Sequence, residues 1–564
     1  MTGPSSELLV RVQAWIADDP DEATRGVLES LVEAARSGDA AALDDLSLRF
    51  SDRLQFGTAG LRGPMGAGPM AMNRVTVRRA AAGLARYLLD TDPAAAERGV
   101  VVGFDGRHQS DVFALDSAAV FAGHGMAVHL LERPLPTPVI AFSVVEAGAC
   151  AGVMVTASHN PPGDNGYKVY LADGAQIVPP MDTAIAARID AVGRLADVPM
   201  VDAEHTVLVR RCATEMVDAY VAHAASVRLV PADAVEPVRV AYTALHGVGA
   251  DVLDAVFARA GLAPVHHVDA QRRPDGRFPT VSFPNPEEPG AMDLVLALAD
   301  DVDADVVLAN DPDADRLAVA IRVPAGVADA RSDWTDGPGR AGARGGWRVL
   351  AGDEIGWLLA DHVLRHTAGD DRLVVTTLVS STLLATMAEA YGVHHRETPT
   401  GFKWIAATAR EHPGLRLVFG YEQALGYLVS TRPLDKDGVT AAVLLAEAAG
   451  LARRDGVMLQ DRLDELAARF GRHRTAERSV RLEPAAAAAA VDRLRGEAPA
   501  EIAGVPVEAI TEPIPGLVRF SLTGGSRVQV RRSGTEPKVK VYAESVGDGE
   551  AVPLAEAVAA LLGR

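Results

Sequence analysis

The chain repeats one supersecondary unit, in which an apolar strand is followed by a polar loop, a helix and a second strand. The unit begins with VVVGF at residue 100 and returns with VRVAYT at 238 and RLVVTTL at 372. Strands that alternate with helices form parallel βαβ sheets, whose ligands bind in the loops beyond the carboxyl ends of the strands. The sequence therefore predicts several α/β domains with their functional residues in those loops.

The length of 564 residues is too great for one hydrophobic core and predicts about three to four domains. A glycine- and aspartate-rich stretch at 324–345 predicts a long surface hairpin, and shorter alternating strands late in the chain predict a smaller α+β domain. In that last region PAAAAAAVDRLRG, at 484–496, predicts a packing helix because proline opens it and glycine closes it. We place the domains at 1–220, 221–348, 349–475 and 476–564.

The charge and cysteine content exclude several classes of protein. A net charge of −20 and a pI near 5.2 argue against nucleic acid or an anionic membrane as the main partner. Cys150 and Cys212 form neither a disulfide framework nor a zinc ligand set, which indicates a reducing compartment. With no secretory signal pattern and no apolar run of membrane-span length, we expect a cytoplasmic protein, either a monomer or a homodimer.

The segment TASHNPPGDNGYKVY, at 156–170, places a serine in a loop of small residues. Ser158 follows the apolar strand AGVMV, His159 is adjacent to it, and Lys168 lies ten positions further on. A hydroxyl beside potential proton carriers can act as a nucleophile. The alternative is a turn in which the polar side chains only satisfy backbone groups. The preceding strand and the turn-forming PPGDNG favour a hydroxyl presented at a strand end.

The segment NDPDADR, at 310–316, carries three carboxylates at alternate positions, Asp311, Asp313 and Asp315. This spacing can direct several oxygens at one hard cation, and with a phosphoryl oxygen it would suit Mg²⁺. The alternative is a tight turn that the aspartates merely solvate. The glycine and glutamate of an EF-hand are absent. Together with Ser158, the segment suggests metal-assisted phosphoryl chemistry at one centre.

Two later segments have the chemistry of a substrate site. RRSGTEPKVKVY, at 531–542, offers a guanidinium, two hydroxyls and backbone amides suited to a phosphate dianion, from Arg531, Ser533, Gly534 and Thr535. A solvated turn is the alternative. In GYEQALGY, at 420–427, Glu422 could accept hydrogen bonds from sugar hydroxyls, although the segment taken alone favours a structural role.

Six motifs in order carry a family resemblance: FGTAGLRG, TASHNPPGDNGYK, NDPDADR, TPTGFKW, GYEQALGY and RRSGTEP. The set resembles the α-D-phosphohexomutase superfamily, in particular its phosphoglucomutase/phosphomannomutase members, and it spans residues 56–542. The resemblance implies four domains around a central cleft. Three would be mixed α/β domains, and the fourth a carboxy-terminal α+β domain of the TATA-box-binding-protein-like type.

The resemblance also implies a role for each matching residue. Ser158 would be the phosphoserine, and Mg²⁺ would be held by the three aspartates and an oxygen of phosphorylated Ser158. Lys168 would be the general acid/base, with His159 assisting at the reacting hydroxyl and Arg62 at the reacting phosphate. The substrate contacts would be Arg316 near the transferring phosphate, Thr400, Gly401 and Glu422 at the sugar, and Arg531, Ser533, Gly534 and Thr535 at the other phosphate.

One departure from the family pattern concerns the sugar. Many members have a serine in the loop GExSG, whereas this chain has Ala424. The loop, the NGYKVY ending and the amino-terminal lead-in look most like a branch that includes bacterial glucose-type enzymes and phosphopentomutases. The sequence is thus interpreted as a mutase of hexose 1-phosphate and 6-phosphate, glucose favoured over mannose, that works through a sugar 1,6-bisphosphate. The alternatives are a phosphopentomutase acting on (deoxy)ribose phosphates and, more remotely, a serine phosphohydrolase or a non-catalytic sugar-phosphate sensor.

Overall fold

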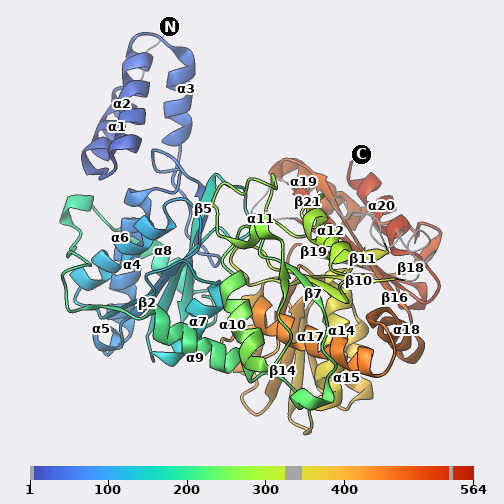
Figure 1. Ribbon diagram of the computed structural model, residues 1–564. Helices are drawn as coiled ribbons and strands as arrows, with labels where there is room; N and C mark the ends of the chain where they lie inside the picture. Colours follow the sequence, from blue (N-terminus) through green and yellow to red (C-terminus); the bar gives the residue numbers. More distant parts are fainter. Residues whose placement is uncertain (1–4, 324–345, 533–537, 564) are drawn as a thin grey trace.

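The computed structural model describes residues 5–323, 346–532 and 538–563, and it builds the chain around four sheets (Figure 1). The hairpin predicted at 324–345 lies outside the described residues. Each sheet carries its own helices, so the predicted four-domain α/β architecture is confirmed. We refer to the domains as first to fourth in chain order.

Three helices precede the first sheet and stand out from the rest of the molecule in Figure 1: α1 (Ser6–Asp18), α2 (Glu22–Arg36) and α3 (Ala40–Arg49). Side chains of Ser5, Asp21 and Asp39 accept hydrogen bonds from the first backbone N–H groups and so fix where each helix begins. Asp18 anchors the group by accepting hydrogen bonds from the Arg194 guanidinium, at 3.1 Å, and from the backbone of Leu195, at 3.0 Å.

The first domain has a six-stranded sheet in the order β1-β5-β4-β2-β3-β6. Its strands are β1 (Leu61–Pro64), β2 (Val100–Phe104), β3 (Val128–Leu130), β4 (Ala151–Val155), β5 (Asp164–Leu171) and β6 (Val209–Arg211). Its helices are α4 (Arg74–Thr91), α5 (Ala95–Arg98), α6 (Ser110–Gly123), α7 (Thr137–Glu146) and α8 (Met181–Asp190). Every residue of β2 and β4 is buried, as expected for central strands of a sheet that is covered on both faces.

The second domain has a five-stranded sheet in the order β11-β10-β9-β7-β8. Its strands are β7 (Val240–Thr243), β8 (His266–His267), β9 (Val306–Ala309), β10 (Ala318–Arg322) and β11 (Trp347–Val349). Helix α9 (Ala213–Ala225) joins it to the first domain and is followed by α10 (Ala250–Ala260), α11 (Asp269–Arg272) and α12 (Asp293–Asp301).

The third domain has a four-stranded sheet in the order β13-β12-β14-β15. Its strands are β12 (Arg372–Thr377), β13 (His394–Thr398), β14 (Arg416–Glu422) and β15 (Gly426–Leu428). Its helices are α14 (Gly352–His366), α15 (Leu383–Ala390), α16 (Phe402–Glu411), α17 (Gly438–Arg454) and α18 (Leu459–Phe470). One hydrophobic core extends from the first domain through the second into the third, which ties these three together.

The fourth domain has a wholly antiparallel sheet in the order β16-β21-β20-β19-β18-β17. Its strands are β16 (His473–Arg481), β17 (Glu501–Ile502), β18 (Val505–Ile514), β19 (Leu517–Leu522), β20 (Arg527–Arg532) and β21 (Lys538–Val546). Helices α19 (Pro484–Gly496) and α20 (Ala551–Leu562) pack on this sheet around a separate hydrophobic core. The smaller α+β domain is therefore confirmed.

The sheets of the first three domains contain antiparallel as well as parallel pairs. Strands β5, β10 and β15 run antiparallel to β4, β9 and β14, because the short loops between them are hairpin connections. The loops carrying Ser158 and the three aspartates are two of these connections. The sheets are thus mixed, as the family resemblance implied.

The predicted domain boundaries fall inside elements of the structure. Residue 220 lies within α9, residue 348 within β11 and residue 475 within β16. Because β11 pairs with β10 and β16 pairs with β21, the sheets divide the chain just after Val349 and just before His473. Which sheet an edge strand joins depends on pairing partners far along the chain.

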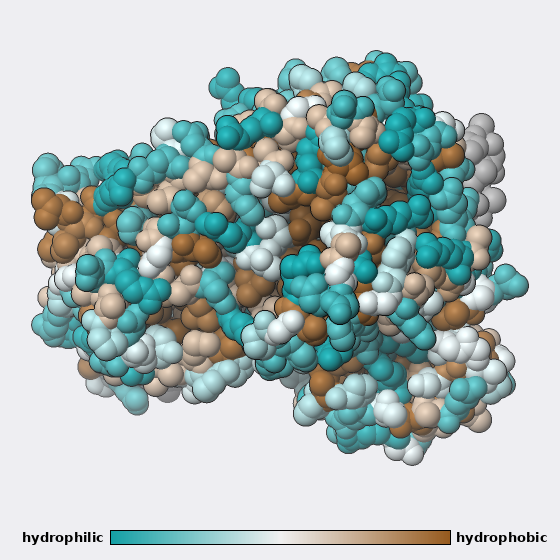
Figure 2. Space-filling view, turned by 90° about the horizontal axis from the view of Figure 1, so that it is seen from below, coloured by the Kyte–Doolittle hydropathy of each residue, from teal (hydrophilic) through white to brown (hydrophobic). Residues whose placement is uncertain are grey.

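The polar surface and the helices fit the expectation of no membrane-spanning segment. Figure 2 views the molecule from below and shows polar residues over much of this face, with apolar residues in groups between them. Of the helices in the described parts of the chain, none combines the length and the apolar character needed to cross a membrane.

Candidate active site

The connection between β4 and β5 presents Ser158 in an unusual backbone conformation. Its φ is 52°, in the left-handed region that a residue other than glycine occupies only when its surroundings enforce it. The Ser158 backbone N–H donates to Thr156 Oγ1 at 2.7 Å, and its side-chain hydroxyl donates to Asp311 Oδ2 at 2.8 Å. The serine is 3% exposed. Its hydroxyl is therefore held against the aspartates of the second domain.

One buried guanidinium holds the serine loop from behind. Arg107, in the loop between β2 and α6, donates to four backbone carbonyls, at 2.6 Å to Ser158, 2.5 Å to Asn160, 2.8 Å to Pro161 and 3.1 Å to Asp164. These four hydrogen bonds to the backbone of the loop between β4 and β5 fix the shape of that loop. The sequence does not single out Arg107, because DGRHQS has the composition of any polar βα loop.

A carboxylate completes this support. Asp105 accepts hydrogen bonds from Thr156 Oγ1 at 2.6 Å, Ser110 Oγ at 2.8 Å and the Arg107 backbone N–H at 3.0 Å. Burial raises the pKa of Asp105, and the Arg107 charge with these hydrogen bonds opposes that rise. Since Thr156 Oγ1 in turn receives the Ser158 N–H, Asp105 and Arg107 together set the position of the serine.

We expect Arg107→Met to destabilise the fold by about 3 to 5 kcal/mol, because it leaves Asp105 buried without its cation. Denaturant unfolding measures this change. The matched control is Arg188→Met, whose guanidinium bonds Asp90 on the surface at 2.9 Å and should cost about 1 kcal/mol or less. Equal effects of the two substitutions would show that Arg107 does not hold the loop.

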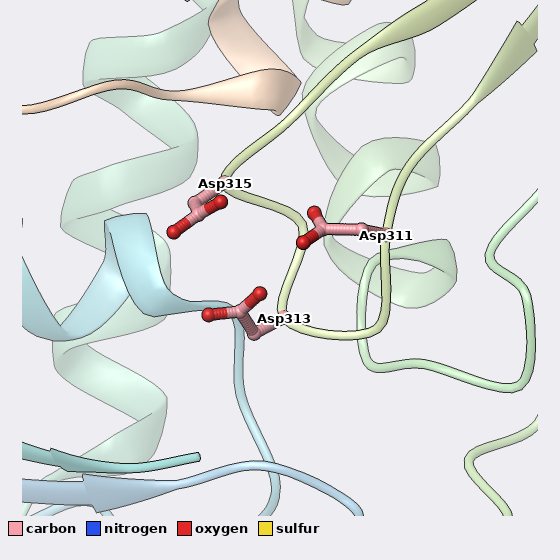
Figure 3. A group of neighbouring side chains, drawn as sticks. All are labelled: Asp311, Asp313 and Asp315. Atoms are coloured by element: carbon pink, nitrogen blue, oxygen red, sulfur yellow. The ribbon is translucent and has the colours of Figure 1, made fainter. Parts of the chain in front are cut away.

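Asp311, Asp313 and Asp315 lie in the loop between β9 and β10, and all three are buried. Their carboxylates converge on a common space, with one oxygen from each within 4.8 Å of the others (Figure 3). Asp313 Oδ1 and Asp315 Oδ1 have no hydrogen-bond partner among the described residues. Buried carboxylate oxygens without donors are costly unless a cation binds them. The triad therefore fits a hard divalent cation, for which carboxylate oxygens are preferred ligands.

The remaining oxygens of two aspartates are held by cations and a hydroxyl. Asp313 Oδ2 accepts from Thr137 Oγ1 and from Lys168 Nζ, both at 2.6 Å. Asp315 Oδ2 lies 2.9 Å from both Lys168 Nζ and Lys436 Nζ. Although burial raises the pKa of Asp315, the two lysines outweigh it and hold that pKa below its usual range. One oxygen of each carboxylate is thus fixed, which leaves the other for a cation.

Asp311 differs from its neighbours because it faces the serine. Burial, followed by the charges of Asp313 and Asp315, raises its pKa well above the usual value. Its Oδ1 accepts the Arg316 backbone N–H at 3.0 Å, while its Oδ2 accepts the Ser158 hydroxyl. A bound cation would remove the like-charge repulsion that raises this pKa.

The predicted proton carriers and arginines of this centre are brought together. His159 Nδ1 lies 3.2 Å from Ser158 Oγ, and burial, then Arg316 and Arg62, lowers the His159 pKa well below its usual value. Arg62, in β1, donates to Asn160 Oδ1 at 3.1 Å. Arg316 lies 3.7 Å from Glu287, and its Nε has no hydrogen-bond partner among the described residues. An imidazole and two guanidinium groups thus surround the serine and the triad.

The predicted sugar contacts also form one group. Glu422 ends β14, and its Oε1 accepts the backbone N–H of Gly401 at 2.7 Å, beside Thr400. Burial raises the pKa of Glu422. The loop after Glu422, here called the sugar loop, contacts the loop at 310–316 that carries the aspartates, here called the metal loop. The Leu317 N–H donates to the Leu425 carbonyl at 3.1 Å, and Arg316 forms an isolated antiparallel β-bridge with Gly426.

The predicted distal phosphate site is described only in part. Arg531 lies in β20, close enough to Lys403 for its charge to lower the Lys403 pKa, after the larger effect of burial. Lys403 also contacts Thr58 of the first domain. Ser533, Gly534 and Thr535 lie outside the described residues. Neither Lys403 nor Lys436 is among the predicted site residues. Lys403 stands in the TPTGFKW motif, whereas Lys436 lies outside all six motifs.

Family comparisons cover most of the chain. Models of the Phosphoglucomutase/phosphomannomutase alpha/beta/alpha domains I, II and III match residues 53–195, 218–324 and 351–470, and the C-terminal domain model matches 479–561. A Haemophilus influenzae protein named "Probable phosphomannomutase" is 42% identical, over 85% of this chain and 94% of its own. A Mus musculus "Phosphopentomutase" is 32% identical, over 96% of this chain and 91% of its own.

Solved structures share the fold. A Phosphoglucomutase/phosphomannomutase family protein from Burkholderia thailandensis superposes with a TM-score of 0.67 at 20% identity, over 90% of this chain and 96% of its own. The four domains, the serine loop and the acidic triad define the class of protein as a phosphosugar mutase. The chain belongs to the α-D-phosphohexomutase superfamily, with phosphoglucomutases, phosphomannomutases and phosphopentomutases.

Proposed function

We propose that this mutase interconverts hexose 1-phosphate and hexose 6-phosphate, with glucose favoured over mannose, through phosphorylated Ser158 and a sugar 1,6-bisphosphate. The observation that carries the proposal is the 2.8 Å hydrogen bond from the Ser158 hydroxyl to Asp311, which puts a nucleophile and an acidic triad in one buried centre. The sugar loop resembles a branch that includes both glucose-type enzymes and phosphopentomutases, so the choice of hexose depends on the substrate comparison below.

The charges around Ser158 suit phosphoryl transfer, which depends mainly on positioning and on neutralising the transferring group. Asp311, Asp313 and Asp315, with an oxygen of phosphorylated Ser158, would hold Mg²⁺, whose chemistry is to neutralise phosphoryl oxygens as a Lewis acid. Arg62 and Arg316 would bind the same phosphate. Lys168, 6% exposed and in contact with two aspartates, would serve as the general acid/base for the sugar hydroxyl, with His159 beside it.

The other end of the substrate would lie against the third and fourth domains. Glu422 would accept hydrogen bonds from sugar hydroxyls near Thr400 and Gly401. The second phosphate would be bound by Arg531 and by Ser533, Gly534 and Thr535. After the first transfer the bisphosphate would turn within the site, so that its other phosphate returns to Ser158.

A phosphopentomutase is the second candidate, and one specific observation favours it. Ala424 removes a hydroxyl that many family members place in the sugar loop, and a pentose phosphate has fewer hydroxyls to bind. The 32% identity to a protein named phosphopentomutase, over 96% of this chain, supports the same alternative. Only a substrate comparison separates the two.

We expect coupled assays on the 1-phosphates of glucose, mannose and ribose to give the highest kcat/KM with glucose. Catalytic glucose 1,6-bisphosphate should raise the rate by keeping Ser158 phosphorylated. A preference for ribose 1-phosphate above tenfold, equivalent to ~1.4 kcal/mol, would replace the hexose assignment by the pentose one. Release of inorganic phosphate without isomerisation would instead indicate a hydrolase, and binding without turnover a sensor.

The proposal includes the partners, the location and the oligomeric state of the protein. The net charge of −20 argues against nucleic acid or an anionic membrane as partner, and it requires that an anionic phosphosugar be held by local cations. Both cysteines are buried and unpaired, which supports a cytoplasmic location. Either a monomer or a homodimer would accommodate the site.

A further inference from the structure

Lys436 stands between the metal loop and the sugar loop, although it belongs to neither. It lies between β15 and α17, its side chain is 12% exposed, and its Nζ is 2.9 Å from Asp315 Oδ2. Its aliphatic stem packs on the sugar loop, since a Cβ added at Gly426 would lie 3.0 Å from Lys436 Cδ. Its charge also acts on Glu422, whose pKa it lowers against the larger effect of burial.

The segment around Lys436 is held by other domains. Gln176 of the first domain donates to Asp435 Oδ2 at 2.8 Å, and the Tyr220 hydroxyl of α9 lies 2.9 Å from both carboxylate oxygens of Asp437. The Gly438 N–H donates to the carbonyl of Ala314 in the metal loop at 3.2 Å. With both of its neighbours fixed, the Lys436 ammonium has little freedom to move away from Asp315.

This fixed charge opposes a bound cation. The metal loop contributes three buried carboxylates, and Lys168 and Lys436 already neutralise part of their charge. A divalent cation at Asp315 Oδ1 would lie a few ångströms from the Lys436 ammonium, because the same carboxylate binds both. At that separation and low effective dielectric, Coulomb repulsion is large enough to weaken cation binding by about tenfold or more.

We propose that Lys436 couples the two ligands of the active site, so that an anionic phosphosugar strengthens metal binding and the metal strengthens phosphosugar binding. This inference rests on the proposed function, which supplies both ligands. A phosphosugar on the sugar loop brings negative charge to the Lys436 side and offsets the repulsion. By thermodynamic linkage, each ligand then raises the affinity of the other by the same factor.

The test is a titration of the full-length protein with Mn²⁺, in which free Mn²⁺ is followed by electron paramagnetic resonance. Titrations are made without sugar phosphate, with glucose 6-phosphate and with ribose 5-phosphate. In the wild type we expect at least one of the two sugar phosphates to tighten Mn²⁺ binding. Lys436→Met should bind Mn²⁺ about tenfold tighter than the wild type without sugar phosphate, and the further tightening by sugar phosphate should shrink.

Three comparison variants keep the test decisive. Lys436→Gln is a second neutral variant in case Lys436→Met does not fold, and Lys436→Arg should retain the coupling because it keeps the charge. Gln176→Leu removes one hydrogen bond of the same segment, while Tyr220 still holds Asp437 and the ammonium remains, so its Mn²⁺ affinity and coupling should stay closer to those of the wild type than to those of the neutral variants.

Two results would overturn the inference in different ways. Unchanged or weaker Mn²⁺ binding by the neutral variants, with coupling equal to that of the wild type, removes the role of Lys436 and leaves the proposed function intact. A wild-type protein that does not bind Mn²⁺ at all removes the metal centre of the proposed function and the coupling with it.

Discussion

Replacement of Ser158 by alanine is expected to lower kcat for sugar-phosphate isomerisation by about 10⁴-fold or more, because no other hydroxyl of the loop occupies the nucleophile position. Radiolabelled glucose 1,6-bisphosphate should leave phosphate on the wild-type protein and none on the variant. Both proteins should unfold at similar temperatures, since alanine fits the same backbone with one hydrogen bond fewer.

The matched control for this substitution is Ser143→Ala. Ser143 is also fully buried, but its hydroxyl donates only to the Val139 carbonyl at 2.7 Å within helix α7. This variant should keep wild-type turnover and labelling. Full turnover by Ser158→Ala would rule out the phosphoserine route, whatever the sugar.

Asp313→Asn is expected to lower kcat by about 10³-fold, the equivalent of ~4 kcal/mol of transition-state stabilisation. The amide nearly preserves the size of the side chain, but it removes the charge that the cation requires and places a donor group beside Lys168 and Thr137. Calorimetric titration with Mg²⁺ should show much weaker binding than in the wild type, independently of turnover.

The control here is Asp371→Asn, because Asp371 pairs with Arg416 at 3.1 Å on the surface, away from the triad. Mg²⁺ affinity and kcat should be unchanged in this variant. Wild-type Mg²⁺ affinity in Asp313→Asn would mean that the triad is not the metal site and that its buried aspartates serve the fold alone.

Local patterns in the sequence were enough to predict individual elements. The strands at 100–104 and 151–155 and the helix at 484–496 lie where their residues predicted them, because an apolar run or the proline and glycine at the ends defines each one locally. Strand direction was not predictable in this way. An apolar strand such as β10 has the same appearance whether its neighbour is parallel or antiparallel.

The site was predictable where its residues stand together in a motif. Ser158 and Asp311 are 153 residues apart in the sequence. Each lies in a distinctive loop, and the fold brings the two loops into contact. Arg107 and Lys436 were missed for the opposite reason. Each acts through contacts to segments far along the chain, and neither DGRHQS nor LDKDG differs from an ordinary surface loop until those contacts are known.

The left-handed backbone at Ser158 limits which amino acids natural variation can place there. A β-branched side chain at a φ of 52° crowds its own backbone, so threonine would be poorly tolerated even though it offers the same hydroxyl. The shape of the main chain therefore disfavours a β-branched hydroxyl residue here, while the chemistry requires a hydroxyl. In any descendant of this protein, an exchange of serine for threonine at 158 would be a drastic change, and we expect selection to remove it.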